Sequence, residues 1–116
     1  MRKGKMVSQG AHASMKAILD LMIKLPTEDE RTLYYDDAPA LKDWIDGIFT
    51  KICVSVDSEA ELLNIYESAK SAGLICSLIQ DSGLTEFDGV PTYTCCAIGP
   101  NWSDEIDSIT SHLKLL

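Results

Sequence analysis

Apolar side chains recur at three- and four-residue steps from position 4 to about position 24, a spacing that predicts one amphipathic helix. Pro26 ends that pattern. Residues 27–38 are polar and acidic, which favours a loop or an irregular insert. A short helix is expected over residues 39–46. The first part of the chain is therefore predicted to hold two helices joined by a polar connection.

Three runs rich in apolar and β-branched residues follow, over residues 50–56, 74–80 and 92–98, and each is typical of a strand. Ser58 and Glu61 have the spacing of a capping box, so a helix is expected between the first two runs. The order strand, helix, strand permits a parallel pairing of 50–56 with 74–80 through a helical crossover.

The end of the chain adds one more predicted helix. Gly73 is a suitable stop for the preceding helix, and Asn101 or Ser103 is expected to cap a last helix that runs to about residue 112. Together these elements predict an α/β fold. We expect a small three-layer sandwich in which a mixed sheet of three to four strands carries helices on both faces. The length of 116 residues suits a single domain over residues 1–116.

The formal net charge of −8 is distributed unevenly. Residues 1–26 hold five basic side chains against one acidic, a net charge of +4, whereas residues 27–116 carry −12. The acidic total argues against a protein that coats nucleic acid by bulk charge. A local basic patch fits a specific contact with a polyanion, and it also fits an ordinary solvated helix face. No run of about 18 apolar residues is present, so the sequence predicts no membrane span.

The cysteines favour thiols over metal ligands or disulfides. None forms a CxxC pair, and all lie in apolar, strand-like runs, so we expect buried thiols in a reducing cytoplasm; they are Cys53, Cys76, Cys95 and Cys96. The two histidines are too few for a typical zinc site. The sequence therefore predicts no metal site and no cofactor.

Four polar residues of the first helix are spaced four, three and four apart, which places them on one face: Lys5, Gln9, His12 and Lys16. Asp81 follows a predicted buried strand, where α/β sheets commonly bind ligands. Each feature also has a plain structural interpretation. The helix face fits a solvated polar surface, and Asp81 with the following residues fits simple turn chemistry.

Several motifs stand in a fixed order along the chain. The segment RKGKMVSQGAHASM covers residues 2–15, GLICSLIQDSGLTEFDGVPTYTCCAIGP covers 73–100, and HLKLL covers 112–116. In this order they resemble the archaeal and eukaryotic type of peptidyl-tRNA hydrolase, over nearly the whole chain. That family has a further strand before its first helix, and this first strand is expected to be absent here.

The resemblance implies an enzyme that cleaves the ester between a peptide and tRNA, without metal or cofactor. It implies a cytoplasmic location, peptidyl-tRNA as the partner and assembly as a homodimer. It implies catalytic roles for Lys5, Gln9, Asp81, Thr85 and Thr94. His12 matches a position whose role, catalytic or substrate-binding, stays open, and Arg2, Lys3 and Lys16 are expected to bind tRNA phosphates.

Ester hydrolysis needs an activated water and a group that stabilises the developing oxyanion. Lys5 suits an electrostatic role, because a lysine amine is a cation at neutral pH. Asp81 either pairs with Lys5 or acts as the base. An alternative is a non-catalytic RNA- or protein-binding module of the same fold, since Leu84 stands where the family usually carries Arg. A small-molecule-binding domain that does not bind RNA has no positive feature in the sequence.

Overall fold

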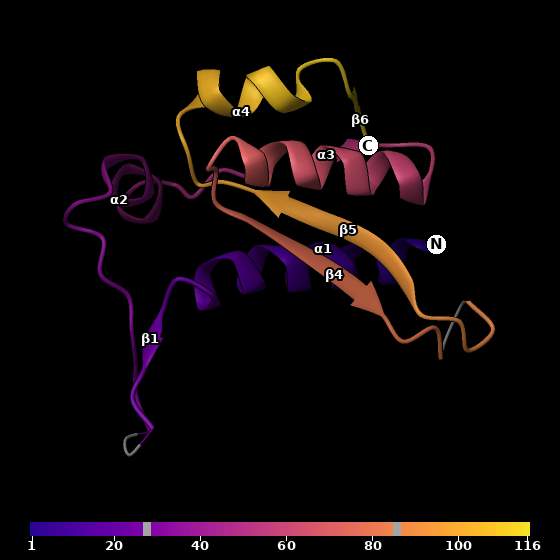
Figure 1. The fold of residues 1–116 in the computed structure, drawn as a ribbon, viewed down its shortest axis with the longest axis horizontal. Coiled ribbons are helices and arrows are strands. Elements are labelled where there is room, and N and C mark those ends of the chain that lie inside the picture. Colours follow the sequence, from indigo (N-terminus) through magenta and orange to yellow (C-terminus); the bar gives the residue numbers. More distant parts are fainter. Residues whose placement is uncertain (27–28, 85–86) are drawn as a thin grey trace.

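The computed structural model describes residues 1–26, 29–84 and 87–116. Its helices are α1 (Lys3–Leu19), α2 (Pro39–Asp46), α3 (Glu59–Ser71) and α4 (Ser103–Thr110). Its strands are β1 (Ile23–Lys24), β2 (Arg31–Thr32), β3 (Val54–Ser55), β4 (Cys76–Asp81), β5 (Thr92–Ile98) and β6 (Lys114–Leu115). Helices and strands are mixed along the chain, which confirms the predicted α/β class (Figure 1). None of the helices in the described ranges is long and apolar enough to cross a membrane.

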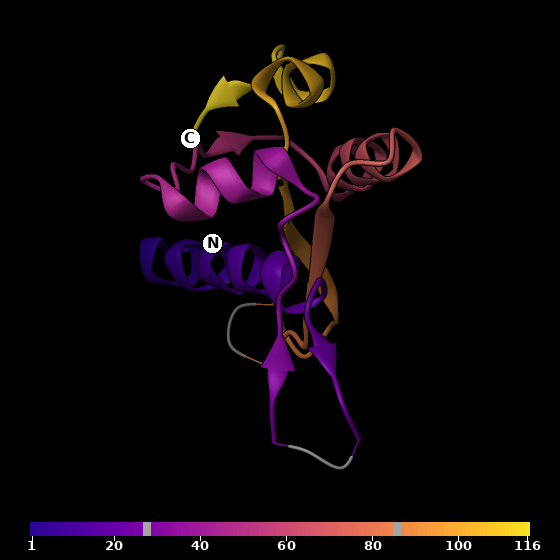
Figure 2. The same cartoon turned by 90° about the vertical axis from the view of Figure 1, so that its left-hand side faces the viewer.

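Strands β4 and β5 form an antiparallel ribbon at the centre of the molecule. Helix α1 packs on one face of this ribbon and helix α3 on the other, so the three layers that the sequence predicts are present (Figure 2). Helix α4 packs against α3, on the side where β3 and β6 also lie. The ribbon is therefore the element that α1 and α3 share.

The sheet itself differs from the prediction of one mixed sheet with three to four strands. The described residues form three separate two-stranded sheets, all antiparallel: β1 with β2, β3 with β6, and β4 with β5. The expected parallel pairing of β3 with β4 is wrong, because β4 pairs with the strand that follows it and β3 pairs with the end of the chain. No strand in the described part of the chain joins these pairs into one sheet.

The boundaries of α3 follow the signals in the sequence. The Ser58 side chain accepts a hydrogen bond from the Glu61 amide at 3.1 Å, and the Glu61 carboxylate accepts one from the Asp57 amide at 3.1 Å, so the predicted capping box is confirmed. Gly73 follows the helix with φ +76°, a conformation that favours glycine.

The cap of α4 was predicted wrongly. Trp102 occupies the N-cap position, and its amide donates to the Glu105 carboxylate at 3.3 Å. The Asn101 side chain instead accepts a hydrogen bond from the Ile75 amide at 3.0 Å, which ties the start of β4 to the end of β5. The Asn101 side chain, which the local sequence assigns to the cap, therefore makes a tertiary contact instead.

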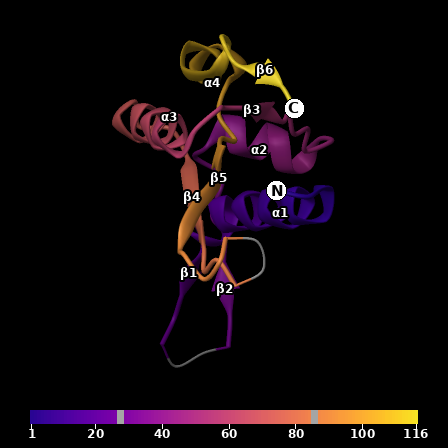
Figure 3. The ribbon, with the colours of Figure 1, turned by 90° about the vertical axis from the view of Figure 1, so that its right-hand side faces the viewer.

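Helix α1 ends at Leu19, earlier than the apolar spacing predicts. The chain then enters the short hairpin of β1 and β2, in which Ile23 pairs with Thr32. This hairpin extends away from the three layers (Figure 3). The segment expected to be a loop or irregular insert therefore contributes β2 to a strand pair.

Small side chains form the contact between helices and ribbon. Ala13 and Ala17 of α1 are 2% and 3% exposed, and Ala69 of α3 is fully buried. The molecule exposes 8100 Å² in total. A monomer of this mass typically exposes roughly 6,200 Å². The helices thus approach the ribbon closely, while the core as a whole is thin.

The cysteines match their prediction only in part. Cys53 is exposed, which contradicts the expectation of a buried thiol, while Cys76, Cys95 and Cys96 are half-buried. Burial raises the pKa of the Cys96 thiol to about 11, with smaller contributions from the neighbouring Cys95 and Cys76. The Cys96 thiol therefore stays protonated near neutral pH.

The close approach of α3 can be tested by enlarging its buried alanine. Ala69→Val should lower the free energy of unfolding in urea by about 1–3 kcal/mol, because the added methyl groups have no space against the ribbon. Ala60→Val makes the same substitution at an exposed position of the same helix and serves as the control. Equal effects of the two substitutions would contradict tight packing at Ala69.

Candidate active site

An ion pair joins the start of α1 to the end of β4. The Lys5 ammonium donates to Asp81 Oδ1 at 2.8 Å, and the two side chains are only 15% and 12% exposed. Lys5 lies in the first turn of α1 and Asp81 is the last residue of β4, and Figure 1 shows these two ends on the same side of the molecule. The pair therefore depends on how α1 lies across the ribbon.

The turn after β4 fixes the Asp81 carboxylate. Its second oxygen, Oδ2, accepts a hydrogen bond from the Gly83 amide at 2.8 Å. Gly83 has φ +84°, and a Cβ at this position would meet the Val90 carbonyl oxygen at 2.2 Å, so only glycine fits. The functional and turn interpretations of this motif are thus compatible. Thr85 and its neighbour Glu86 lie outside the described residues.

Asp81 carries a charge that its neighbours stabilise. The hydrogen bond from Lys5 lowers the pKa of the Asp81 carboxyl most, followed by the bond from the Gly83 amide. Desolvation acts in the opposite direction, and the charges of Lys5 and His12 add smaller lowering effects. Asp81 is therefore ionised at neutral pH.

A second pair lies one turn further along α1. The Thr94 hydroxyl of β5 donates a hydrogen bond to Gln9 Oε1, and Gln9 is only 4% exposed. Because the carbonyl oxygen of the amide is occupied in this way, the NH₂ group of Gln9 is the part that offers donors. The position of Gln9 is about 6 Å along the helix axis from that of Lys5.

The remaining two residues of the predicted polar face are placed differently. His12 is exposed. Lys16 is half-exposed and pairs with Asp20 at 2.7 Å. The structure therefore brings Lys5 and Gln9 to the ribbon, and leaves His12 and Lys16 at the surface.

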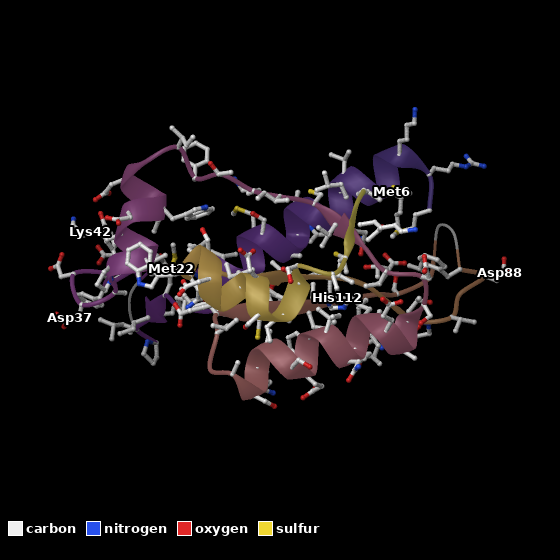
Figure 4. The ribbon with its side chains drawn as sticks, turned by 90° about the horizontal axis from the view of Figure 1, so that it is seen from above. Met6, Met22, Asp37, Lys42, Asp88 and His112 are labelled. Carbon is white, nitrogen blue, oxygen red and sulfur yellow. The ribbon has the colours of Figure 1, made fainter. Side chains whose placement is uncertain are left out.

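The start of α1 is strongly basic. Arg2 is the N-cap residue, Lys3 is exposed, and the first turn contains no acidic side chain. This order is unusual, because the positive end of a helix dipole normally favours acidic neighbours. Asp81, from β4, supplies the carboxylate that the sequence of α1 lacks. Figure 4 shows Asp88, in the loop after β4, at the same end of the molecule as Met6 of α1, with Lys42 of α2 at the other end.

Two side chains that the sequence analysis did not place at the site contact the backbone of α1. Ser77 donates to the Ala13 carbonyl at 2.7 Å, and Cys95 donates to the Gln9 carbonyl at 3.1 Å. Their identities alone carry no signal of this contact, because it depends on the sheet register. Over the described ranges, no group of three or more His, Cys, Asp or Glu side chains could hold a metal ion.

The whole chain matches a known family. Residues 1–116 fit the sequence profile of the family described as peptidyl-tRNA hydrolase PTH2. A peptidyl-tRNA hydrolase of Methanocaldococcus jannaschii is 44% identical over 116 residues, which cover all of this chain and 90% of that protein. Enzymes of the same name from Metallosphaera sedula and Methanothermobacter thermautotrophicus are each 37% identical over the full chain and 90% and 89% of their own lengths. By profile and by identity, the chain belongs to the PTH2 family of peptidyl-tRNA hydrolases.

Proposed function

We propose that this protein hydrolyses the ester bond between a peptide and the ribose of tRNA, and that the Lys5–Asp81 and Gln9–Thr94 pairs form its active site. The observation that carries this proposal is the juxtaposition of the two pairs at the basic start of α1. Family membership supports the reaction. In this reaction water attacks the ester carbonyl carbon, the carbon–oxygen bond to the ribose breaks, and the ribose oxygen takes up a proton.

Lys5 stabilises the negative charge that develops on the carbonyl oxygen of the ester. Its ammonium is held in place by Asp81 and is largely shielded from water, so its charge acts more strongly than it would in solution. The partial positive charge at the start of α1 adds to the same effect.

Asp81 positions Lys5. A general base works best when its pKa lies near the working pH, whereas the pKa of Asp81 is lowered by Lys5 and by the Gly83 amide. The interpretation of Asp81 as partner of Lys5 is therefore favoured over its interpretation as base.

Gln9 orients the substrate carbonyl or the attacking water through its NH₂ group. Thr94 holds the Gln9 amide in the required orientation by donating to Oε1. Thr85 is proposed, from the resemblance alone, to hydrogen-bond the water or the ribose. His12 is proposed, from the resemblance and from its exposed place on α1, to have a catalytic or substrate-binding role.

Arg2, Lys3 and Lys16 are proposed to bind tRNA phosphates. Arg2 and Lys3 lie at the start of α1, and Lys16 lies about 16 Å along the helix from Lys5, so the three suit a backbone that follows α1. Independence from metal ions, a cytoplasmic location and assembly as a homodimer, all implied by the resemblance, stay predictions.

Replacing Lys5 tests its electrostatic role. Lys5→Gln should lower kcat for release of tRNA from diacetyl-lysyl-tRNA by roughly 100-fold, because the oxyanion loses its cation. Lys70→Gln, which neutralises an exposed lysine of α3, should leave kcat and KM unchanged. Wild-type kcat in Lys5→Gln would contradict the proposed role. If the wild-type protein bound tRNA without releasing peptide, the non-catalytic alternative would hold instead.

The salt dependence of the reaction tests the proposed phosphate contacts. In Lys3→Ala, KM should rise while kcat stays the same, and the slope of log(kcat/KM) against log salt should become shallower by about 0.7–0.9. Lys70→Ala is the matched control. An unchanged slope in Lys3→Ala would contradict a contact between Lys3 and a tRNA phosphate.

A further inference from the structure

The register of the β4–β5 ribbon shifts beside the proposed site. Ile79 pairs with Cys95, but the next residue of β4, Gln80, pairs with Tyr93. Thr94 therefore has no partner across the ladder, which is the arrangement of a β-bulge.

The bulge brings two neighbouring side chains to the same residue of α1. In a regular strand, successive side chains point to opposite faces. Here the Thr94 hydroxyl donates to the Gln9 side chain, and the Cys95 thiol donates to the Gln9 carbonyl at 3.1 Å. One residue of α1 is thus held by its backbone and by its side chain at once.

A second donor lies one helical turn along α1. Ser77, which is only 2% exposed, donates to the Ala13 carbonyl at 2.7 Å. Ser77 and Cys95 face α1 from opposite strands, since Ser77 pairs with Ala97 and Ile79 with Cys95. The two donors therefore form hydrogen bonds to successive turns of α1.

These contacts call for an explanation, because α1 does not need them for its own hydrogen bonding. Helical carbonyls already accept bonds from amides four residues on, and a buried hydroxyl is costly wherever it is not fully satisfied. An alanine at position 77 would fill a small-residue contact without that cost. What the two donors add is a fixed rotation and a fixed axial position of α1 on the ribbon.

We propose that Ser77 and Cys95 are positioning residues that set the register of α1, so that Gln9 meets Thr94 and Lys5 meets Asp81. The inference rests on the proposed function of those two pairs. Neither Ser77 nor Cys95 is assigned a contact with substrate, because both side chains donate to the backbone of α1. They act through the backbone of α1, and a small slip of the helix would separate both pairs together.

Four variants test this. Ser77→Ala and Cys95→Val each remove a donor, the first with almost no change of volume, and each should lower kcat by about tenfold or more while KM stays within about twofold. Ser77→Cys and Cys95→Ser keep a donor and should recover most of kcat. Thr110→Val is the matched control, because the Thr110 hydroxyl makes the same kind of bond, to the Ile106 carbonyl, on α4. It should change neither constant.

A second measurement does not depend on activity. The chain contains four side chains with an NH₂ group, those of Gln9, Gln80, Asn64 and Asn101, so the Gln9 signals can be assigned by NMR of the ¹⁵N-labelled protein. They should shift in Ser77→Ala and Cys95→Val, and keep their wild-type positions in Thr110→Val and Cys95→Ser. Unchanged Gln9 signals, or wild-type kcat in both donor-removing variants, would overturn the inference. An inactive wild-type protein would overturn the proposed function instead, and the Gln9 signals would still decide the register.

Discussion

The buried contact between Gln9 and β5 is the constraint on which the proposed site depends. Gln9 lies in the small-residue interface between α1 and the ribbon, where its side-chain oxygen accepts a hydrogen bond from Thr94 and its backbone carbonyl accepts one from Cys95. A buried amide that loses its partner is costly, so this interface admits few alternative positions of the helix. Together with the bond from Ser77 to the Ala13 carbonyl, this contact limits where the other residues of α1 can lie.

Lys5 illustrates the consequence. The start of α1 concentrates positive charge at the end of a helix where the dipole is already positive. Such an arrangement is unfavourable for the isolated helix, and it becomes tolerable when the Asp81 carboxylate is brought to it from β4. Gly83 contributes by allowing the turn that aims its own amide at the same carboxylate. The Lys5 ammonium and the Gln9 amide are therefore both fixed in position. Both suit an ester whose carbonyl oxygen gains negative charge during the reaction.

Local features of the fold could be predicted from the sequence, and non-local ones could not. The cap of α3 at Ser58 and its stop at Gly73 were correct, because each depends on residues a few positions apart. The strand partners were predicted wrongly, because the order strand, helix, strand is compatible with a parallel pair and also with the antiparallel pairs that form. The predicted Asn101 cap was wrong for a related reason, because the Asn101 side chain accepts a hydrogen bond from the amide of Ile75, 26 residues earlier in the chain.

The site shows the same division. The helical spacing placed Lys5 and Gln9 on one face, and the position of Asp81 after a buried strand marked it as a candidate. Thr94, the partner of Gln9, was named from the resemblance alone. The bulge at Thr94 has no signature in the sequence, because it is a property of how two strands pair. A double-mutant cycle on kcat/KM, with Gln9→Met and Thr94→Val as the single variants, tests the assembly of the site most directly. If Gln9 and Thr94 act as one unit, the double variant should be no less active than the worse single variant. Losses that multiply would contradict the account, because the two side chains would then act independently.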